Sequence, residues 1–292
     1  MEPPISVLVR RGDTVESVHR VHAAAVRDGE LVASAGEPEL LTFMRSAAKP
    51  LQALPLARAY ADLPDHELAI ACASHLAEPD QLAAALSLLA RAHAREGDLE
   101  CGAEGDPPRR INHNCSGKHA GMLAVCRARG WPIQGYRLAD HPLQEELRTE
   151  VEAASAEPHL ATAVDGCGVV TFALPLRGMA RAFGGLETLE AGDRVAAAMR
   201  ARPELIRGER AADTMLMRAL PGWIAKGGAE GLMCAAGDGL GVALKAEDGA
   251  ARALRPALAA FLGRLGHDLP TAFAVVGVEN SRGEQVGEIV AV

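Results

Sequence analysis

Apolar and polar residues alternate near both ends of the chain, as is typical of strands that bury one face. Near the N-terminus this pattern predicts three strands, with the turn-forming pair Asp28-Gly29 before the third. Their expected ranges are residues 5–10, 20–26 and 31–35. Near the C-terminus the pattern predicts four more strands, at residues 231–236, 240–245, 271–277 and 285–292.

Between the two ends, the apolar residues recur at the three-to-four-residue spacing of helices. We expect helices rich in Ala and Leu at residues 51–60, 81–95, 143–154, 193–201 and 250–265. Strands at both ends with helices between them predict an α+β fold, in which one antiparallel sheet built from both termini carries an inserted helical lobe. We expect a single domain over residues 1–292, with the sheet lobe at about 1–40 and 225–292 and the helical lobe at about 41–224.

Composition narrows the classes of protein that fit. Of the 292 residues 49% are hydrophobic but only 3% aromatic, so Ala, Leu and Val must build the core. The net charge of −8 argues against a nucleic-acid-binding protein, which needs a basic surface. No apolar signal segment follows the N-terminus, and Arg255 and Arg264 interrupt the most apolar late stretch. We therefore expect a cytoplasmic protein without membrane contact, in which the six cysteines are free, buried or metal-bound.

The strongest chemical signal is a Ser-x-x-Lys element, Ser46 and Lys49, predicted at a helix start. That spacing places both side chains on one face of a helix. A lysine can accept the serine proton only after burial or a second positive charge has removed its own proton, and Arg45 or another lysine could provide that charge. Alone, this short motif is more often an N-capping serine beside a solvated lysine. Pro50 also disfavours helical geometry at Lys49.

A second cluster is dense in thiols and basic groups. Cys115 and Lys118 are again three residues apart, and Cys167 lies between two glycines in the segment 165–168. Two thiolates and a nitrogen donor can hold Zn²⁺, with His113 or His119 as the usual donor type and lysine as an unusual one. The alternative is that both cysteines are buried small apolar residues.

Together these stretches resemble the rhizobial-type (thermolabile, class 3) L-asparaginases, the asparaginase II family. The resemblance follows nearly the whole chain in order. Its motifs are VESVHR at residues 15–20, RSAAKPLQALP at 45–55, HNCSGKHAGML at 113–123, DGCG at 165–168, FALPL at 172–176, KGGAEG at 226–231 and ALKAEDG at 243–249.

The resemblance implies a fold like that of serine β-lactamases and penicillin-binding proteins, and dimeric assembly. It implies two Ser-Lys pairs, Ser46 with Lys49 and Ser74 with Lys245. It further implies zinc next to the site, held by Cys115, Lys118 and Cys167. For substrate binding it implies Asp165 at the amino group of the substrate, and we expect Arg45 and His75 beside it. The expected reaction is hydrolysis of L-asparagine to L-aspartate and ammonia.

The sequence departs from the family at Leu76-Ala77, where a small polar residue and Gly are usual, and also at Met44 and Val21. Two other readings stay open. A penicillin-interacting serine hydrolase would need Lys-Thr-Gly at Lys245, which is absent. A catalytically inactive protein that binds an amino acid or zinc would fit the altered loop.

Overall fold

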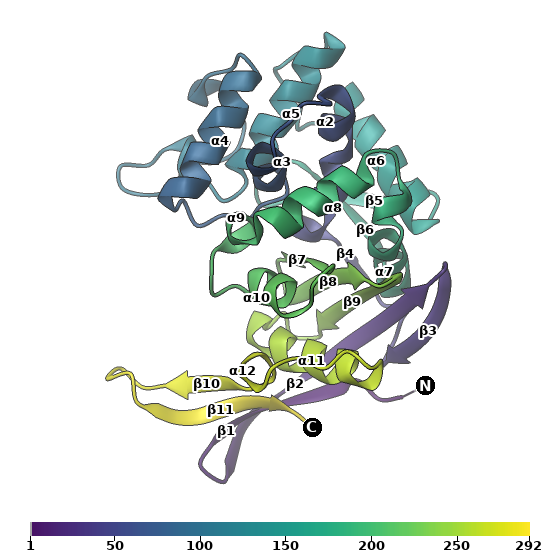
Figure 1. Ribbon diagram of the computed structural model, residues 1–292, viewed down its shortest axis with the longest axis vertical. Helices are drawn as coiled ribbons and strands as arrows, with labels where there is room; N and C mark the ends of the chain where they lie inside the picture. The colour runs from purple at the N-terminus through teal and green to yellow at the C-terminus, as the bar shows by residue number, and fades with distance from the viewer. Residues whose placement is uncertain (1) are drawn as a thin grey trace.

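An eight-stranded antiparallel sheet crosses the molecule, with helices on both of its faces (Figure 1). The computed structural model describes residues 2–292. The strand order is β10-β11-β1-β2-β9-β8-β7, and β3 pairs with β2. The strands are β1 (Ile5–Arg11), β2 (Thr14–Arg27), β3 (Glu30–Ala35), β7 (Ile224–Gly228), β8 (Leu232–Gly237), β9 (Leu240–Ala246), β10 (Val276–Glu279) and β11 (Gln285–Ala291).

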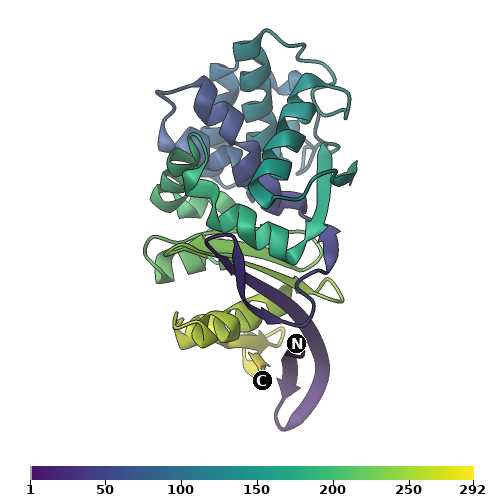
Figure 2. The same ribbon diagram turned by 90° about the vertical axis from the view of Figure 1, so that its right-hand side faces the viewer.

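The centre of this sheet is covered on both sides, as the view in Figure 2 shows. Helix α7 (Leu176–Gly184) packs on β2, β8 and β9, while α11 (Leu254–Arg264) packs on β1, β9 and β11. Gly241 makes the first contact possible, since a Cβ there would lie 2.0 Å from the Ala180 carbonyl oxygen. Strands β8 and β9 are therefore almost continuously apolar and do not alternate.

The chain between β3 and β7 forms the helical region at the top of Figure 1. Short helical turns join its helices, among them the 3₁₀ turn η1 (Arg45–Ala48). Its helices other than α7 are α1 (Lys49–Gln52), α2 (Leu54–Ala59), α3 (Asp65–Ala71), α4 (Pro79–Arg91), α5 (Ser116–Arg129), α6 (Pro142–Ser155), α8 (Gly192–Ala201), α9 (Pro203–Arg207) and α10 (Ala212–Ala219).

A small second sheet, which the sequence analysis did not predict, lies inside this region. Its order is β4 (Leu41–Phe43), β6 (Val170–Pro175), β5 (Ala161–Val164). Immediately after β4, the Met44 N–H donates to the Phe172 carbonyl at 2.8 Å. This sheet therefore fixes the start of the Ser46 turn against the segment that follows Cys167.

The predicted α+β arrangement, with one antiparallel sheet from both termini around a helical region, is confirmed. Several predicted elements differ. The strand expected at 20–26 begins at Thr14, and the helix expected at 81–95 ends at Arg91. The helix expected at 51–60 is divided at Ala53 into α1 and α2, and the strand expected at 271–277 begins with the helical turn α12 (Thr271–Ala274) after Pro270. No helix within residues 2–292 is long and apolar enough to cross a membrane.

Candidate active site

Ser46 lies in the 3₁₀ turn η1, directly before α1, and its side chain is partly exposed. Side chains three residues apart eclipse in a 3₁₀ turn, so Ser46 and Lys49 lie on the same side of it. Lys49 is helical, with φ −58° and ψ −38°, even though Pro50 follows. Arg45 has a φ of +49°, a conformation that L-residues rarely adopt and that is common at functional sites.

Lys49 is completely buried. Its ammonium donates to the Ala73 carbonyl and, at 3.0 Å, to the Ser74 hydroxyl. Within residues 2–292, no hydrogen bond joins the Ser46 hydroxyl to another protein group. Lys49 thus forms a hydrogen bond with Ser74, the second predicted serine. The hydroxyl of Ser46, the first predicted serine, has no such partner in this part of the chain.

Ser74 lies in the loop between α3 and α4, and its backbone N–H donates to the Ile206 carbonyl at 2.8 Å. The next residue, His75, is buried, with Nε2 at 2.8 Å from the Ser116 hydroxyl and Nδ1 accepting from the Ala77 N–H at 3.1 Å. Burial, and then the positive charge of Lys49, lower the pKa of His75 to about 4. His75 is therefore neutral near pH 7, with both ring nitrogens occupied.

Lys245 is not joined to Ser74 by any hydrogen bond within residues 2–292. Its ammonium donates to the Ala246 carbonyl on its own strand. Burial lowers its pKa, and the charges that act on it are Glu230, Asp248 and Glu247. It lines a cavity of about 400 Å³ together with residues of β2 and β4.

The charge of a different lysine, Lys226 on the edge strand β7, interacts with the charge of Lys49. It is completely buried, with Nζ 3.6 Å from Asp213 Oδ2 and donating to the Gly227 carbonyl at 2.7 Å. Burial is the main cause that lowers its pKa to about 8; Asp213 opposes that shift and the charge of Lys49 adds to it. The sequence analysis included Lys226 in the KGGAEG motif but gave it no role at the site, although only four of the 30 basic residues are lysines.

Arg45 and Asp165 meet beside Ser46. Arg45 Nε lies 2.5 Å from Asp165 Oδ1, and the Arg45 N–H donates to Thr171 Oγ1 at 3.1 Å. Asp165 Oδ1 also accepts from the Gly166 N–H at 2.7 Å. A guanidinium and a carboxylate at one edge of the site match the two charged ends of an amino acid.

The thiol cluster forms where α5 begins and where the turn between β5 and β6 reaches it. Cys115 caps α5, and Lys118 Nζ donates to Cys167 Sγ at 3.0 Å. All three side chains are buried. A hydrogen bond from Cys167, together with the charges of Lys49 and Lys118, holds the pKa of Cys115 well below its usual value. The two predicted sulfur donors and the predicted lysine donor thus converge.

Each of the two histidines considered as donors has one ring nitrogen bonded to a protein group, while His119 Nε2 is buried without a hydrogen-bond partner in residues 2–292. His113 Nδ1 accepts from the Cys115 N–H at 3.0 Å, and His119 Nδ1 lies 2.7 Å from the Tyr136 hydroxyl. Over residues 2–292, no three His, Cys, Asp or Glu side chains are placed to hold a metal together. A metal between the two thiols would therefore need Lys118 as its nitrogen donor.

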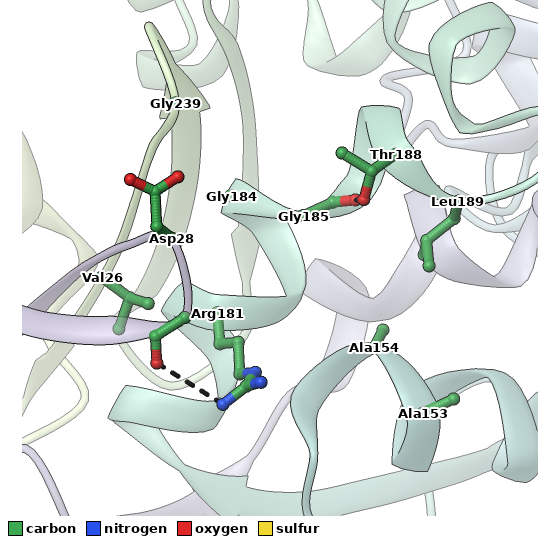
Figure 3. A pocket seen from close by; sticks show the side chains of 11 residues that line it. Val26, Asp28, Ala153, Ala154, Arg181, Gly184, Gly185, Thr188, Leu189 and Gly239 are labelled. Carbon is green, nitrogen blue, oxygen red and sulfur yellow. Dashed lines mark hydrogen bonds between the residues drawn. The ribbon is translucent and has the colours of Figure 1, made fainter.

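A separate cavity of about 410 Å³ lies at the turn between β2 and β3, where Arg181 donates to the Gly29 carbonyl (Figure 3). Figure 3 shows that its wall also includes Asp28, Thr188 and Gly239. None of the predicted catalytic or metal-binding residues lines this cavity.

Comparison with known families identifies the class of protein. The family model described as L-asparaginase II matches residues 7–291, and a protein of that class is an asparagine amidohydrolase. The chain belongs to the L-asparaginase II family. The resemblance drawn from the sequence motifs is thereby confirmed. A comparison with curated proteins found no match.

Proposed function

We propose that the protein hydrolyses L-asparagine to L-aspartate and ammonia with Ser46 as the nucleophile and Lys49 as the base. One observation carries the Ser-Lys assignment: Lys49 is wholly buried one turn after Ser46, and its ammonium contacts a second serine hydroxyl at 3.0 Å. A buried amine in contact with a serine hydroxyl is placed to exchange a proton with such a group. The partly exposed Ser46 hydroxyl is the group that a substrate can reach.

In the first half of the reaction, the neutral Lys49 amine takes the Ser46 proton while the serine oxygen bonds to the side-chain amide carbon. The oxyanion is stabilised by backbone N–H groups, including that of Ser46. The carbon–nitrogen bond then breaks, and the nitrogen leaves as ammonia with a proton from the Lys49 ammonium, passed through the Ser74 hydroxyl.

In the second half, water gives a proton to Lys49 and attacks the aspartyl ester, and Ser46 recovers its proton as aspartate leaves. Lys226 provides the second positive charge that this scheme needs near Lys49, a role that the sequence analysis left to Arg45 or another lysine. Lys245 bonds to the carbonyl of Ala246, which supports a role outside the proton path.

Arg45 and Asp165 are proposed to hold the α-carboxylate and the amino group of the substrate. The two side chains are in contact at 2.5 Å, so both charges lie at the same place beside Ser46, the proposed nucleophile. His75, whose ring nitrogens are both occupied by protein groups, is proposed to orient the Ser74 loop rather than to bind the substrate directly.

Zinc is proposed as a resident metal held by Cys115, Lys118 and Cys167. The donor set fits, because two thiols and one amine converge in a buried place with Lys118 Nζ 3.0 Å from Cys167 Sγ. When bound, zinc supplies a fixed positive charge next to the substrate site. The protein's own part is to hold these donors on α5 and the turn before β6.

The likeness of the fold to serine β-lactamases and penicillin-binding proteins remains part of this proposal, supported by an antiparallel sheet with helices on both faces. Homodimeric assembly is proposed on the family resemblance. A cytoplasmic location is proposed because the six cysteines are free thiols.

An ammonia assay with asparagine tests the nucleophile. Ser46→Ala should lose at least a thousandfold in kcat while its circular dichroism spectrum is unchanged, because no other group forms the ester. Ser281→Ala, a substitution of the same kind at an exposed turn far along the chain, should keep full activity. Near wild-type ammonia release by Ser46→Ala would refute the assignment.

The same assay separates the two other readings. A reporter cephalosporin that is hydrolysed while asparagine is not would favour the penicillin-interacting hydrolase. Binding of asparagine without ammonia release would favour the inactive binding protein.

A further inference from the structure

We propose that Asp213 is a positioning residue that sets how many protons the buried Lys49–Lys226 pair holds. It does so by placing one buried negative charge against Lys226. The inference rests on the proposed function, because the pair matters for catalysis only if one of its amines acts as the base.

Asp213 is built into the site. It lies in the first turn of α10, where the helix N-terminus favours a negative charge, and it is 1% exposed. Its Oδ2 accepts from the Gly227 N–H at 2.9 Å and lies 3.6 Å from Lys226 Nζ. Gly227 leaves room for the carboxylate, since a Cβ there would lie 3.3 Å from Asp213 Oδ1.

Few buried carboxylates are available for this purpose. Within residues 2–292, Glu67 and Asp213 are the two that are buried, and Glu67 is paired with Arg91 on the other side of the helical region. The Lys49 ammonium is held by uncharged oxygens of Ala73 and Ser74. Asp213 is therefore the buried carboxylate that is placed against Lys226.

The groups facing Lys226 come from four elements. Asp213 on α10 is the group that raises its pKa most. Lys49 of α1 and Arg207 at the end of α9 lower it, and Cys115 at the start of α5 raises it to a smaller degree. Asp213 thus favours the charged form of Lys226, and the charge of Lys49 opposes it.

The consequence is a defined pH dependence. With Asp213 ionised, Lys226 keeps its proton to a higher pH than it otherwise would, and a positive charge stays beside the Lys49 amine. Without that negative charge, Lys226 loses its proton at lower pH. The pH range in which one amine is charged and the other is neutral then moves down.

The test compares the pH dependence of kcat/KM in the wild type and in Asp213→Asn. Asparagine keeps an oxygen that can accept from the Gly227 N–H but removes the charge. Both limbs of the profile should move to lower pH, by about one unit. Asp213→Glu should move them back, and Asp193→Asn, an exposed aspartate at the start of α8, should leave them unchanged.

A merely structural role would lower activity or stability without moving either limb, and that result would overturn the proposal. If Asp213→Asn fails to fold, Gly227→Ala takes its place, because the added methyl would lie 3.3 Å from Asp213 Oδ1 and shift the carboxylate slightly without removing it. The same downward shift is expected there, to a smaller extent, and unmoved limbs would count equally against the proposal.

A second readout does not need activity. Only four lysines are present, so ¹³C labelling of lysine Cε gives four signals that can be titrated by NMR, with Lys226 assigned by its loss in Lys226→Arg. Its titration midpoint should fall by about one pH unit in Asp213→Asn. An unmoved midpoint would overturn the proposal. If the wild type released no ammonia, the proposed function would fail while this titration still decided the role of Asp213.

Discussion

At the scale of single residues, motif spacing directed attention to Ser46 and Lys49, and the family resemblance added Ser74. The structure places the Lys49 ammonium 3.0 Å from the Ser74 hydroxyl, although 25 residues separate them in the sequence. Lys226, which lies in the KGGAEG motif, was given no role because its partner Asp213 lies on a different element and its surroundings in the sequence are small residues. Lys245 was assigned to the site by the family resemblance, and its ammonium bonds to a carbonyl of its own strand.

A second residue-scale feature is the loop after Ser74, where the family usually has Gly and this chain has Ala77. Ala77 has a φ of +59°, in the left-handed region that glycine occupies without strain. Ala77→Gly should therefore raise the free energy of unfolding by about 1 kcal/mol, as measured by urea denaturation.

The matched control is Ala83→Gly, an exposed position inside helix α4. There glycine only adds flexibility, and the free energy of unfolding should fall by about 0.5–1 kcal/mol. If the free energy of unfolding fell equally in the two variants, the backbone at Ala77 would not be strained.

At the scale of elements, periodicity predicted well wherever an element buries one face over several turns or strand residues. Strands β1 and β9 and helices α6 and α8 begin and end within about two residues of their expected limits. The small sheet was missed because β4 has three residues and β5 is mostly exposed, so neither alternates long enough to be recognised. The helix at 51–60 was predicted as continuous, but the chain starts a new helix at Leu54-Pro55.

The thiol cluster also belongs to this scale, since it joins the start of α5 to the turn before β6. Protein purified without added metal should carry about one zinc per chain by elemental analysis. A chelator should lower the melting temperature, because loss of a ligand present at a hundredfold its Kd removes about 2.7 kcal/mol of stability.

Two cysteine variants sharpen that experiment. Cys115→Ser should lose both the zinc and the response to chelator, while Cys126→Ser, at a buried position further along α5, should keep both. Zinc-free wild type that ignores the chelator would contradict the metal assignment.

At the scale of the whole molecule, the site exists only because distant parts of the chain meet. The edge strand β7 runs beside η1, and a Cβ on Gly228 would lie 2.9 Å from the Met44 carbonyl oxygen. This contact brings the C-terminal half of the sheet, with Lys226, to the turn that carries Ser46. The sequence predicted the sheet and the family. It could not predict this contact, because the contact depends on how the backbone of β7 packs against η1.

The most direct test of the account is to identify the residue that carries the aspartyl group during turnover. Wild-type enzyme is mixed with asparagine, quenched in acid within milliseconds and analysed by peptide mass spectrometry. We predict an aspartyl ester on Ser46 that is absent from Ser46→Ala and present in Ser281→Ala. An ester on Ser74, or an ester that persists in Ser46→Ala, would contradict the account.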